Sequence, residues 1–232
     1  MPTEFAGFPA EGLQFFASLQ RNNRREWFQP RKQIFDDQLK QPMRELVAAV
    51  NGSLQRFAPD YVNDPDKAIY RIYRDTRFSN DKTPYKDHIA ASMHRRGVKC
   101  SAGFYFAVSH KEFAIGGGLY QPDKDTLAAL RTCFAERHAE FRKITAARPL
   151  KQLLGDVQGE CLTRTPKGFP SDHPAADLLR LKQCYLYRTY PPDIVTTPAL
   201  NTEIVKHLRA MVPFIEFLNS GLKFNRTVTN GR

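Results

Sequence analysis

The sequence predicts an α+β fold in which an antiparallel sheet of about five strands is packed by N-terminal, central and C-terminal helices. Apolar residues recur at steps of three and four near both ends of the chain, which is the period of an amphipathic helix. The middle of the chain instead contains short runs rich in aromatic and β-branched residues, which are typical of strands. No repeat and no shift in composition marks a boundary. We therefore expect residues 1–232 to form a single α+β domain with a polar tail at 220–232.

The first part of the chain is expected to be helical. Asn23 and Glu26 have the spacing of a capping box, which predicts that a helix begins there after a first short helix has ended. A longer amphipathic helix with one apolar stripe is predicted over residues 35–57. Pro42 lies inside this stripe and lacks a backbone N–H, so we expect it to kink or split the helix.

Strand-like segments begin at residue 68. Two of them are separated only by His110 and Lys111, which predicts a tight hairpin. We expect the first four segments to form an antiparallel meander and the last to follow a central helix. The segments are residues 68–75, 88–94, 103–109, 112–120 and 183–190.

Three helices are predicted in the second half of the chain. The central helix has Pro122 at its first position and acidic residues in its first turn. A short helix is expected over residues 174–182, with Ser171 and Asp172 as candidate caps. A last helix follows the apolar positions of residues 204–218.

The composition favours an anionic partner. The chain has 35 Lys and Arg against 24 Asp and Glu, which gives a formal charge of +11. Such a balance suits nucleic acid, phosphorylated metabolites or an acidic surface. The four cysteines show no C-x-x-C spacing, which predicts reduced thiols in a cytoplasmic protein. Because no segment has the pattern of a signal peptide or of a membrane span, we expect no membrane partner.

The segment RIYRDTRFSNDKTPYK, residues 71–86, concentrates the candidate binding residues. Five basic side chains stand against the two acids Asp75 and Asp81, which leaves a surplus of three positive charges. Arginine presents a planar fork of donors that suits phosphate or carboxylate. We therefore expect this segment to bind a phosphate-bearing small molecule or nucleotide, while the two acids orient the basic side chains. The expected ligand contacts are Arg71, Arg74, Arg77, Ser79, Lys82, Tyr85 and Lys86.

Two alternatives stay open for the same segment. The charge could serve an extended nucleic-acid surface rather than a pocket. The acids and bases could also neutralise one another in a buried network, and the protein would then be structural or an adaptor. In either case Tyr73 and Phe78 are expected to pack, whereas Tyr85 could stack on a ligand or pack.

A second basic turn, RTPKGFP at residues 164–170, precedes His173. If it folds beside the first segment, Lys167 would extend the positive surface and His173 would supply a titratable group. Whether a reaction follows binding is left open. Hydrolysis or transfer of a phosphorylated group fits best, with Asp75, Asp81 or His173 moving protons.

Other candidate sites are less well supported. The run of three glycines at 116–118 precedes a helix, but acids in the first turn of that helix would repel a phosphate. A close backbone approach is therefore the better interpretation. The histidines and cysteines show no compact ligand spacing, so no metal and no cofactor is predicted. The single Trp27, flanked by arginines, is expected to anchor the core rather than to stack on a base.

Several long motifs resemble one uncharacterised family. Besides R-I-Y-R-D-T-R-F-S-N-D-K-T-P-Y-K, these are NNRREWF (22–28), FAIGGGLYQPDKDTLAALR (113–131), RTPKGFPSDHPAADLL (164–179) and FLN (217–219). In this order they resemble domain-of-unknown-function family 2461, with coverage of roughly residues 8 to 219. Asn80 stands where a basic residue is expected. The resemblance implies membership of this family but brings no activity and no site residues.

Overall fold

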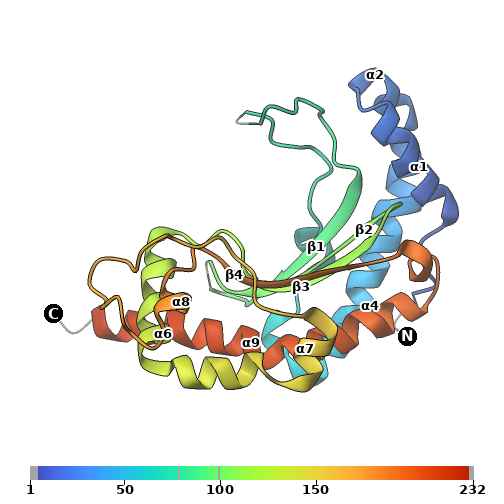
Figure 1. The fold of residues 1–232 in the computed structure, drawn as a ribbon. Coiled ribbons are helices and arrows are strands. Elements are labelled where there is room, and N and C mark those ends of the chain that lie inside the picture. The colour runs from blue at the N-terminus through green and yellow to red at the C-terminus, as the bar shows by residue number, and fades with distance from the viewer. Residues whose placement is uncertain (1–4, 78, 99, 230–232) are drawn as a thin grey trace. The chain divides into compact units, whose positions relative to one another are not determined.

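The computed structural model describes residues 5–77, 79–98 and 100–229, the last seven of these by their backbone alone. It has an α+β fold, in which helices pack with one antiparallel sheet of four strands in the order β1-β2-β3-β4 (Figure 1). The strands are β1 (His88–His94), β2 (Gly103–Ser109), β3 (Phe113–Leu119) and β4 (Cys184–Tyr190).

The chain divides into two compact units. The first unit comprises residues 1–93, 105–115 and 189–206, and the second comprises residues 94–104, 116–188 and 207–232. That residues 1–232 form a single domain stays a prediction.

The sheet has four strands rather than about five, because residues 68–75 do not form a continuous ladder. This segment makes only two isolated antiparallel bridges, from Ile69 to Ala91 and from Tyr73 to Tyr85. Between the two bridges the chain advances four residues from Ile69 to Tyr73, but six residues from Tyr85 to Ala91. The two extra residues on the Tyr85–Ala91 side interrupt the pairing. The expected first strand is therefore an irregular edge beside β1.

Helices dominate the N-terminal part of the first unit. The predicted apolar stripe is buried, although Pro42 splits its helix as expected. The π segment η2 precedes Pro42, which lies in the first turn of α4. The elements of this part are α1 (Ala10–Arg21), α2 (Arg25–Phe28), η1 (Gln29–Arg31), α3 (Lys32–Phe35), η2 (Asp36–Lys40), α4 (Gln41–Phe57), η3 (Pro59–Tyr61) and α5 (Pro65–Ala68). The same unit also contains η4 (Pro192–Ile194), which follows β4 in the chain.

The backbone carbonyl of Gln38, four residues before Pro42, lies where the helix is split. Pro42, four residues later, has no N–H to donate to that carbonyl. Instead the oxygen lies against Gly12 of α1, where an added Cβ would be 2.6 Å away. A glycine is therefore required at the point where α1 approaches the split helix.

The second unit contains α6 (Lys124–Thr145), α7 (Arg148–Leu154) and α8 (Ala176–Leu179), and α9 (Ala199–Thr229) begins in the first unit. Asp123 is the N-cap of α6, since its carboxylate accepts the N–H of Thr126 at 2.8 Å. Pro122 thus lies before the helix rather than at its first position. The short helix α8 is only four residues long, and its N-cap Ala175 makes no side-chain bond.

The glycine run in β3 is a close backbone approach, as predicted. A Cβ added to Gly116 would lie 2.3 Å from the carbonyl oxygen of Leu186, and one added to Gly118 would lie 2.4 Å from that of Cys184. Both oxygens belong to the neighbouring strand β4. Glycines are needed here because any side chain would collide with the adjacent backbone.

Two further observations concern the whole of the described chain. Within residues 5–77, 79–98 and 100–229, no helix is long and apolar enough to cross a membrane. The four cysteines, all of them described, form no disulfide bond, as expected from their spacing: Cys100, Cys133, Cys161 and Cys184. Burial raises the pKa of the Cys184 thiol, which makes it unreactive.

Candidate functional site

The segment of residues 71–86 lies in the first unit and connects α5 to β1. In Figure 1 it extends away from the start of β1 as a loop without regular secondary structure. Residues 74–83 are called the tip. The side chains of Tyr70, Arg71, Tyr73 and Lys86, where the loop leaves and rejoins the sheet edge, are called the base. Phe78, which was expected to pack, lies outside the described residues.

Tyr85 fixes the loop to the helices of the first unit. Its ring stacks on Phe28 with centroids 4.1 Å apart, and only 2% of the residue is exposed. Of the two roles considered for Tyr85, the geometry fits packing. Its role as a ligand contact stays a prediction.

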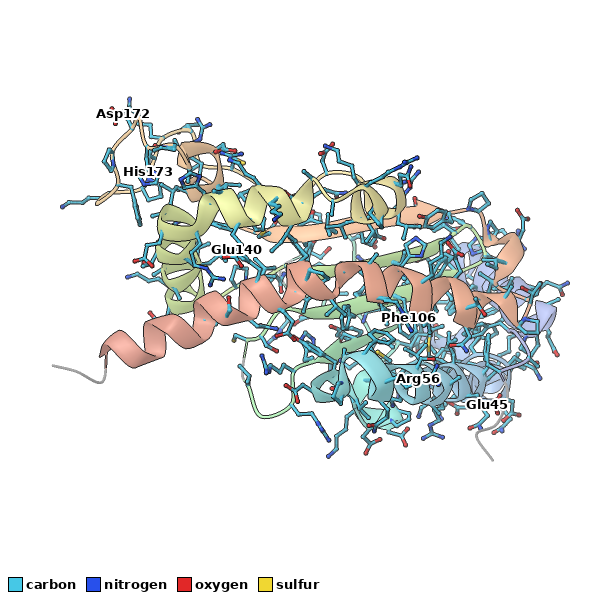
Figure 2. The ribbon with its side chains drawn as sticks, turned by 90° about the horizontal axis from the view of Figure 1, so that it is seen from below. Glu45, Arg56, Phe106, Glu140, Asp172 and His173 are labelled. Atoms are coloured by element: carbon cyan, nitrogen blue, oxygen red, sulfur yellow. The ribbon has the colours of Figure 1, made fainter. Side chains whose placement is uncertain are left out.

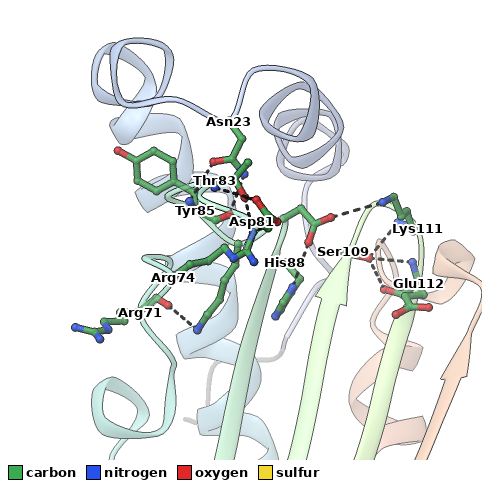
Figure 3. Close-up of polar contacts among 12 residues, drawn as sticks. Asn23, Arg71, Arg74, Asp81, Thr83, Tyr85, His88, Ser109, Lys111 and Glu112 are labelled. Atoms are coloured by element: carbon green, nitrogen blue, oxygen red, sulfur yellow. Dashed lines mark hydrogen bonds and ion pairs between the residues drawn. The ribbon is translucent and has the colours of Figure 1, made fainter. Parts of the chain in front are cut away.

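Asn23 completes this anchor. Its Nδ2 donates to the carbonyl of Tyr85 at 2.9 Å, and its Oδ1 accepts the N–H of Tyr85 at 3.0 Å (Figure 3). Tyr73 and Tyr85 form a bridge whose hydrogen bonds come from the flanking residues, so the polar backbone groups of Tyr85 point away from Tyr73. The Asn23 amide therefore makes the two hydrogen bonds to the backbone of Tyr85 that a neighbouring strand would otherwise make.

The capping-box prediction for Asn23 was wrong for this reason. Helix α2 begins after Arg24, which makes no side-chain capping bond. The amide of Asn23 is already used by Tyr85, 62 residues away in sequence. Satisfying two half-buried backbone groups takes precedence over capping an exposed helix start, whose N–H groups can bond to water.

At the tip, Arg74 and Asp81 form one ion pair. The Arg74 guanidinium bonds to the Asp81 carboxylate and also donates to the Thr83 hydroxyl. The same carboxylate accepts the Thr83 N–H at 2.9 Å and its hydroxyl at 2.8 Å. Asp81 thus closes a turn and orients Arg74, as expected.

The other charged side chains of the tip also bond to oxygens or guanidinium groups of the tip. Both oxygens of Asp75 accept from the Arg77 guanidinium, at 3.0 and 2.7 Å. The Lys82 ammonium donates to the carbonyl of Thr76 at 2.9 Å. The hydrogen bond from Arg77 lowers the pKa of Asp75 to about 2.

The hydrogen bond from Arg74 likewise lowers the pKa of Asp81 to about 2. Both carboxylates are therefore ionised at neutral pH, which makes them poor general acids. Their role in moving protons stays a prediction, as does an anion contact from the hydroxyl of Ser79. The backbone N–H of Ser79 donates to the carbonyl of Thr76 at 3.4 Å.

The base is organised differently. Arg71 is exposed, and within the described part of the chain its guanidinium has no hydrogen-bond or ion-pair partner. Figure 3 shows this side chain pointing away from Arg74 and Asp81. Its charge also acts on Asp75, but both oxygens of that carboxylate are occupied by Arg77.

Lys86 lies beside Arg71 at the base. Its Nζ donates to the backbone carbonyl of Arg71 at 3.0 Å and lies 5.3 Å from the centroid of the Tyr70 ring. Burial, and then the positive charge of Arg71, lower the pKa of Lys86. The base thus holds two neighbouring cations, and no carboxylate contributes to the pKa shift of the lysine.

Two tyrosines of the base are open to solvent. Tyr70 is 42% exposed and Tyr73 is 45% exposed. The prediction that Tyr73 packs is therefore only half right. One side of its ring meets Tyr85 at a centroid distance of 5.5 Å, while much of the rest is accessible.

Asp87, next to the base in sequence, joins two further side chains. Its carboxylate lies 3.4 Å from Nδ1 of His88 and 3.6 Å from Nζ of Lys111 (Figure 3). Burial acts to raise the pKa of Asp87, but the hydrogen bond and charge of His88, together with Lys111, outweigh it and lower the pKa. Among the described residues, no group of three or more His, Cys, Asp or Glu could hold a metal ion.

Lys167 and His173 belong to the second unit. Lys167 is exposed in a turn closed by the bond from the Phe169 N–H to the Pro166 carbonyl. Nδ1 of His173, which Figure 2 labels beside Asp172, accepts the N–H of Ala175 at 3.0 Å. That these residues fold beside the loop stays a prediction.

Sequence reasoning missed two residues of this site. Nothing in the sequence indicated that Asn23 holds the backbone of Tyr85, because a hydrogen bond between residues 62 positions apart leaves no local pattern. Tyr70 directly precedes the charged segment, and an aromatic residue beside clustered arginines could have indicated it.

Comparison with known proteins identifies the family of the chain. Residues 11–217 match a family described as "Conserved hypothetical protein (DUF2461)". No curated protein and no solved structure matches the chain.

Proposed function

The chain belongs to this family, DUF2461, and we propose that it binds a phosphate-bearing small molecule at the base of the loop through Arg71 and Lys86. One observation carries the proposal. The Lys86 ammonium is half-buried and bonds to the backbone carbonyl of Arg71 at 3.0 Å, and burial, followed by the charge of Arg71, lowers its pKa. An anion bound beside Lys86 would offset both effects, because a nearby negative charge favours the charged form of a lysine.

The side chains of the base suit a phosphate. The guanidinium of Arg71 offers a fork of donors, and the ammonium of Lys86 has further N–H groups besides the one that bonds to the Arg71 carbonyl. Hydrogen bonds to charged groups are stronger than neutral ones, so two cations can hold one phosphate firmly.

The tip supports this proposal by its contrast with the base. Arg74, Arg77 and Lys82 already bond to protein oxygens, and a ligand would have to displace these partners. We infer that the tip shapes the loop, while the surplus charge of the segment is available at the base. A purely structural role fits the tip better than the base.

The proposal is confined to binding. Asp75 and Asp81, the carboxylates expected to move protons, are held ionised in ion pairs. A cytoplasmic location is also proposed, because cysteines that form no disulfide are typical of a reducing compartment.

The test uses ribose 5-phosphate as a probe, with binding measured by titration calorimetry and by the shift in thermal midpoint. Replacing Arg71 with Gln, or Lys86 with Met, should weaken binding about tenfold or more, because each change removes a charge-assisted hydrogen bond. Equal binding by these variants and the wild type, or no binding by the wild type, would contradict the proposal.

Arg56 provides the matched control. It is exposed on α4 in the same unit and is labelled in Figure 2, and its guanidinium makes a 3.4 Å bond to the Ser53 hydroxyl. Arg56→Gln changes the net charge by the same amount as Arg71→Gln. It should leave the affinity for ribose 5-phosphate unchanged, which separates a specific site from a general effect of charge.

A further inference from the structure

We infer that the ligand of the base is a nucleotide unit, in which a nucleobase stacks on Tyr70 or Tyr73 while its phosphate meets Arg71 and Lys86. This inference rests on the proposed phosphate site and names the class of molecule that the site takes. Three observations support it: the exposure of the two rings, the way they are held, and the charges around them.

Exposed large apolar side chains are rare among the described residues. They are Tyr70, Tyr73 and Tyr120, and the first two flank Arg71 in sequence. A single exposed aromatic residue needs no special explanation. Here, however, two exposed tyrosines stand on either side of Arg71 in the sequence, and the Arg71 guanidinium has no protein partner in the described chain. A stacking site for nucleobases has the same composition, because it combines aromatic faces with positive charge.

Tyr73 is a firmly supported platform. Its ring lies against Tyr85, and Tyr85 in turn stacks on Phe28, with centroid distances of 5.5 and 4.1 Å. Both supporting rings are almost completely buried. A ring fixed from behind loses little conformational freedom on binding, so it can stack on a flat ligand at low entropic cost.

Tyr70 brings an aromatic face and a cation together. The Lys86 ammonium lies 5.3 Å from its ring centroid, and the ring of Tyr105 lies 6.3 Å away on β2. Because the same ammonium bonds to the Arg71 carbonyl, Tyr70, Arg71 and Lys86 form one connected group. A ligand that stacks here would also reach positive charge.

The acids near the base would not repel a phosphate strongly. Asp75 and Asp81 are paired with arginines of the tip. Lys32, whose charge acts on Tyr73, pairs with Asp36 at 2.7 Å. Each of these three carboxylates therefore already has a cation beside it.

A sugar phosphate would use the cations but leave both tyrosines without a partner. A nucleotide uses both features, because its base has an aromatic face and its phosphate is anionic. A free nucleotide and a nucleotide within a single strand share this chemistry, and the experiment distinguishes them.

The experiment compares AMP with ribose 5-phosphate, which differ only by the adenine base. We expect AMP to bind the wild-type protein about tenfold more tightly, the amount that one stacked base typically contributes. One of the two variants Tyr73→Leu and Tyr70→Leu, the one that removes the stacking ring, should remove this preference, and both should leave binding of ribose 5-phosphate largely unchanged; a preference that survives in both variants would overturn the inference. Tyr73→Phe, which keeps the ring, should retain the preference, and unchanged binding of ribose 5-phosphate by Tyr73→Leu shows that this variant is folded.

Tyr120 supplies the matched control. It is 61% exposed in the second unit, so Tyr120→Leu removes an equally open aromatic ring away from the base. This variant should keep the preference for AMP.

The outcomes separate this inference from the function on which it depends. Equal affinity for AMP and ribose 5-phosphate, with both lost in Arg71→Gln, would overturn the nucleotide inference and keep the phosphate site. Failure of the wild type to bind either probe would overturn both.

A hexanucleotide of deoxythymidine as a third probe identifies the source of the nucleotide. Binding tighter than AMP, and falling steeply with salt, supports a single strand. Binding no tighter than AMP supports a free nucleotide.

Discussion

The tip and the base of one loop use the same kinds of side chain in opposite ways. At the tip, Arg74 and Arg77 are each paired with a carboxylate a few residues away. At the base, Arg71 and Lys86 lie beside each other, and burial, followed by the positive charge of Arg71, lowers the pKa of the lysine. The comparison teaches that a surplus of charge counted over a segment is not shared evenly. The surplus positive charge lies at the base, where the backbone brings Arg71 and Lys86 together and no carboxylate is bonded to either side chain in the described part of the chain.

Both regions depend on the same anchor in the first unit. Tyr85 carries the bridge to Tyr73, and Asn23 holds the backbone of Tyr85. The difference between tip and base can therefore be tested by first removing the anchor and then changing each region by itself.

The largest effect is expected for Tyr85→Ala. It removes a buried aromatic ring stacked on Phe28 and should lower the free energy of unfolding by about 3–5 kcal/mol. Urea unfolding measures the change. Tyr73→Ala removes a ring that is 45% exposed and should cost much less. Equal losses in the two variants would show that the loop is not anchored at Tyr85.

A smaller loss is expected for Asn23→Ala. This change leaves the N–H and carbonyl of Tyr85 without their partners, which should cost about 1–3 kcal/mol in the free energy of unfolding. Asn80 at the tip is exposed and serves as the control, so Asn80→Ala should be nearly neutral. If Asn23→Ala were equally neutral, water would replace the amide without penalty, and the strand-like role of Asn23 would be wrong.

Changes to the tip should affect binding less than changes to the base. Arg74→Met and Asp81→Asn break a partly exposed ion pair, and we expect them to reduce stability less than Asn23→Ala. Both should still bind ribose 5-phosphate with nearly wild-type affinity in calorimetry. If Arg74→Met abolished binding while Arg71→Gln did not, the assignment of tip and base would have to be exchanged.

The smallest expected effect is the dependence of the free energy of unfolding on pH, which should have a different origin at the tip and at the base. The folded-state pKa of Asp75 and of Asp81 is about 2, below the unfolded value of about 3.9. Their contribution to stability is therefore complete above the unfolded pKa and is lost as the pH falls through about 2. NMR titration of the carboxylate carbons should show both midpoints well below 3.9.

Lys86 should behave in the opposite way. Its folded-state pKa is lowered below the ordinary value of 10.5, so its charge destabilises the fold at neutral pH. Stability should increase as the pH rises through the folded pKa toward the unfolded one. NMR titration of the Lys86 ammonium measures the pKa directly. Saturating ribose 5-phosphate should raise this pKa, and a pKa that does not move would place the phosphate elsewhere.

Much of the secondary structure could be predicted because it is a local property. The strands expected at 88–94 and 103–109 have those bounds, and the glycine run lies where two backbones approach closely. Residues 68–75 were predicted as a strand from a loose alternation. They form only two bridges, because the register of pairing depends on the partner segment and not on the residues themselves.

The candidate site was predictable in its composition and not in its contacts. The sequence indicated that Asp75 and Asp81 would orient arginines, since acids and bases lie close together there. It did not indicate that Arg71 would be left without a protein partner in the described chain, nor that Tyr73 would be nearly half exposed. Such choices depend on which side chains meet in space, and several partners of similar energy compete for each charge.

By itself, then, the amino-acid sequence determined where helices and strands form, which residues enter the core, and that one segment carries more positive than negative charge. These properties follow from hydrophobic periodicity, from backbone sterics and from counting charges, all of which act over a few residues. Only the tertiary structure decided that Asn23 binds Tyr85 and that Lys86 lies between Tyr70 and Arg71. The physical reason is that a hydrogen bond or a cation–π contact between distant residues has no periodic signature. It forms only after the packing of the whole unit has brought the two groups together.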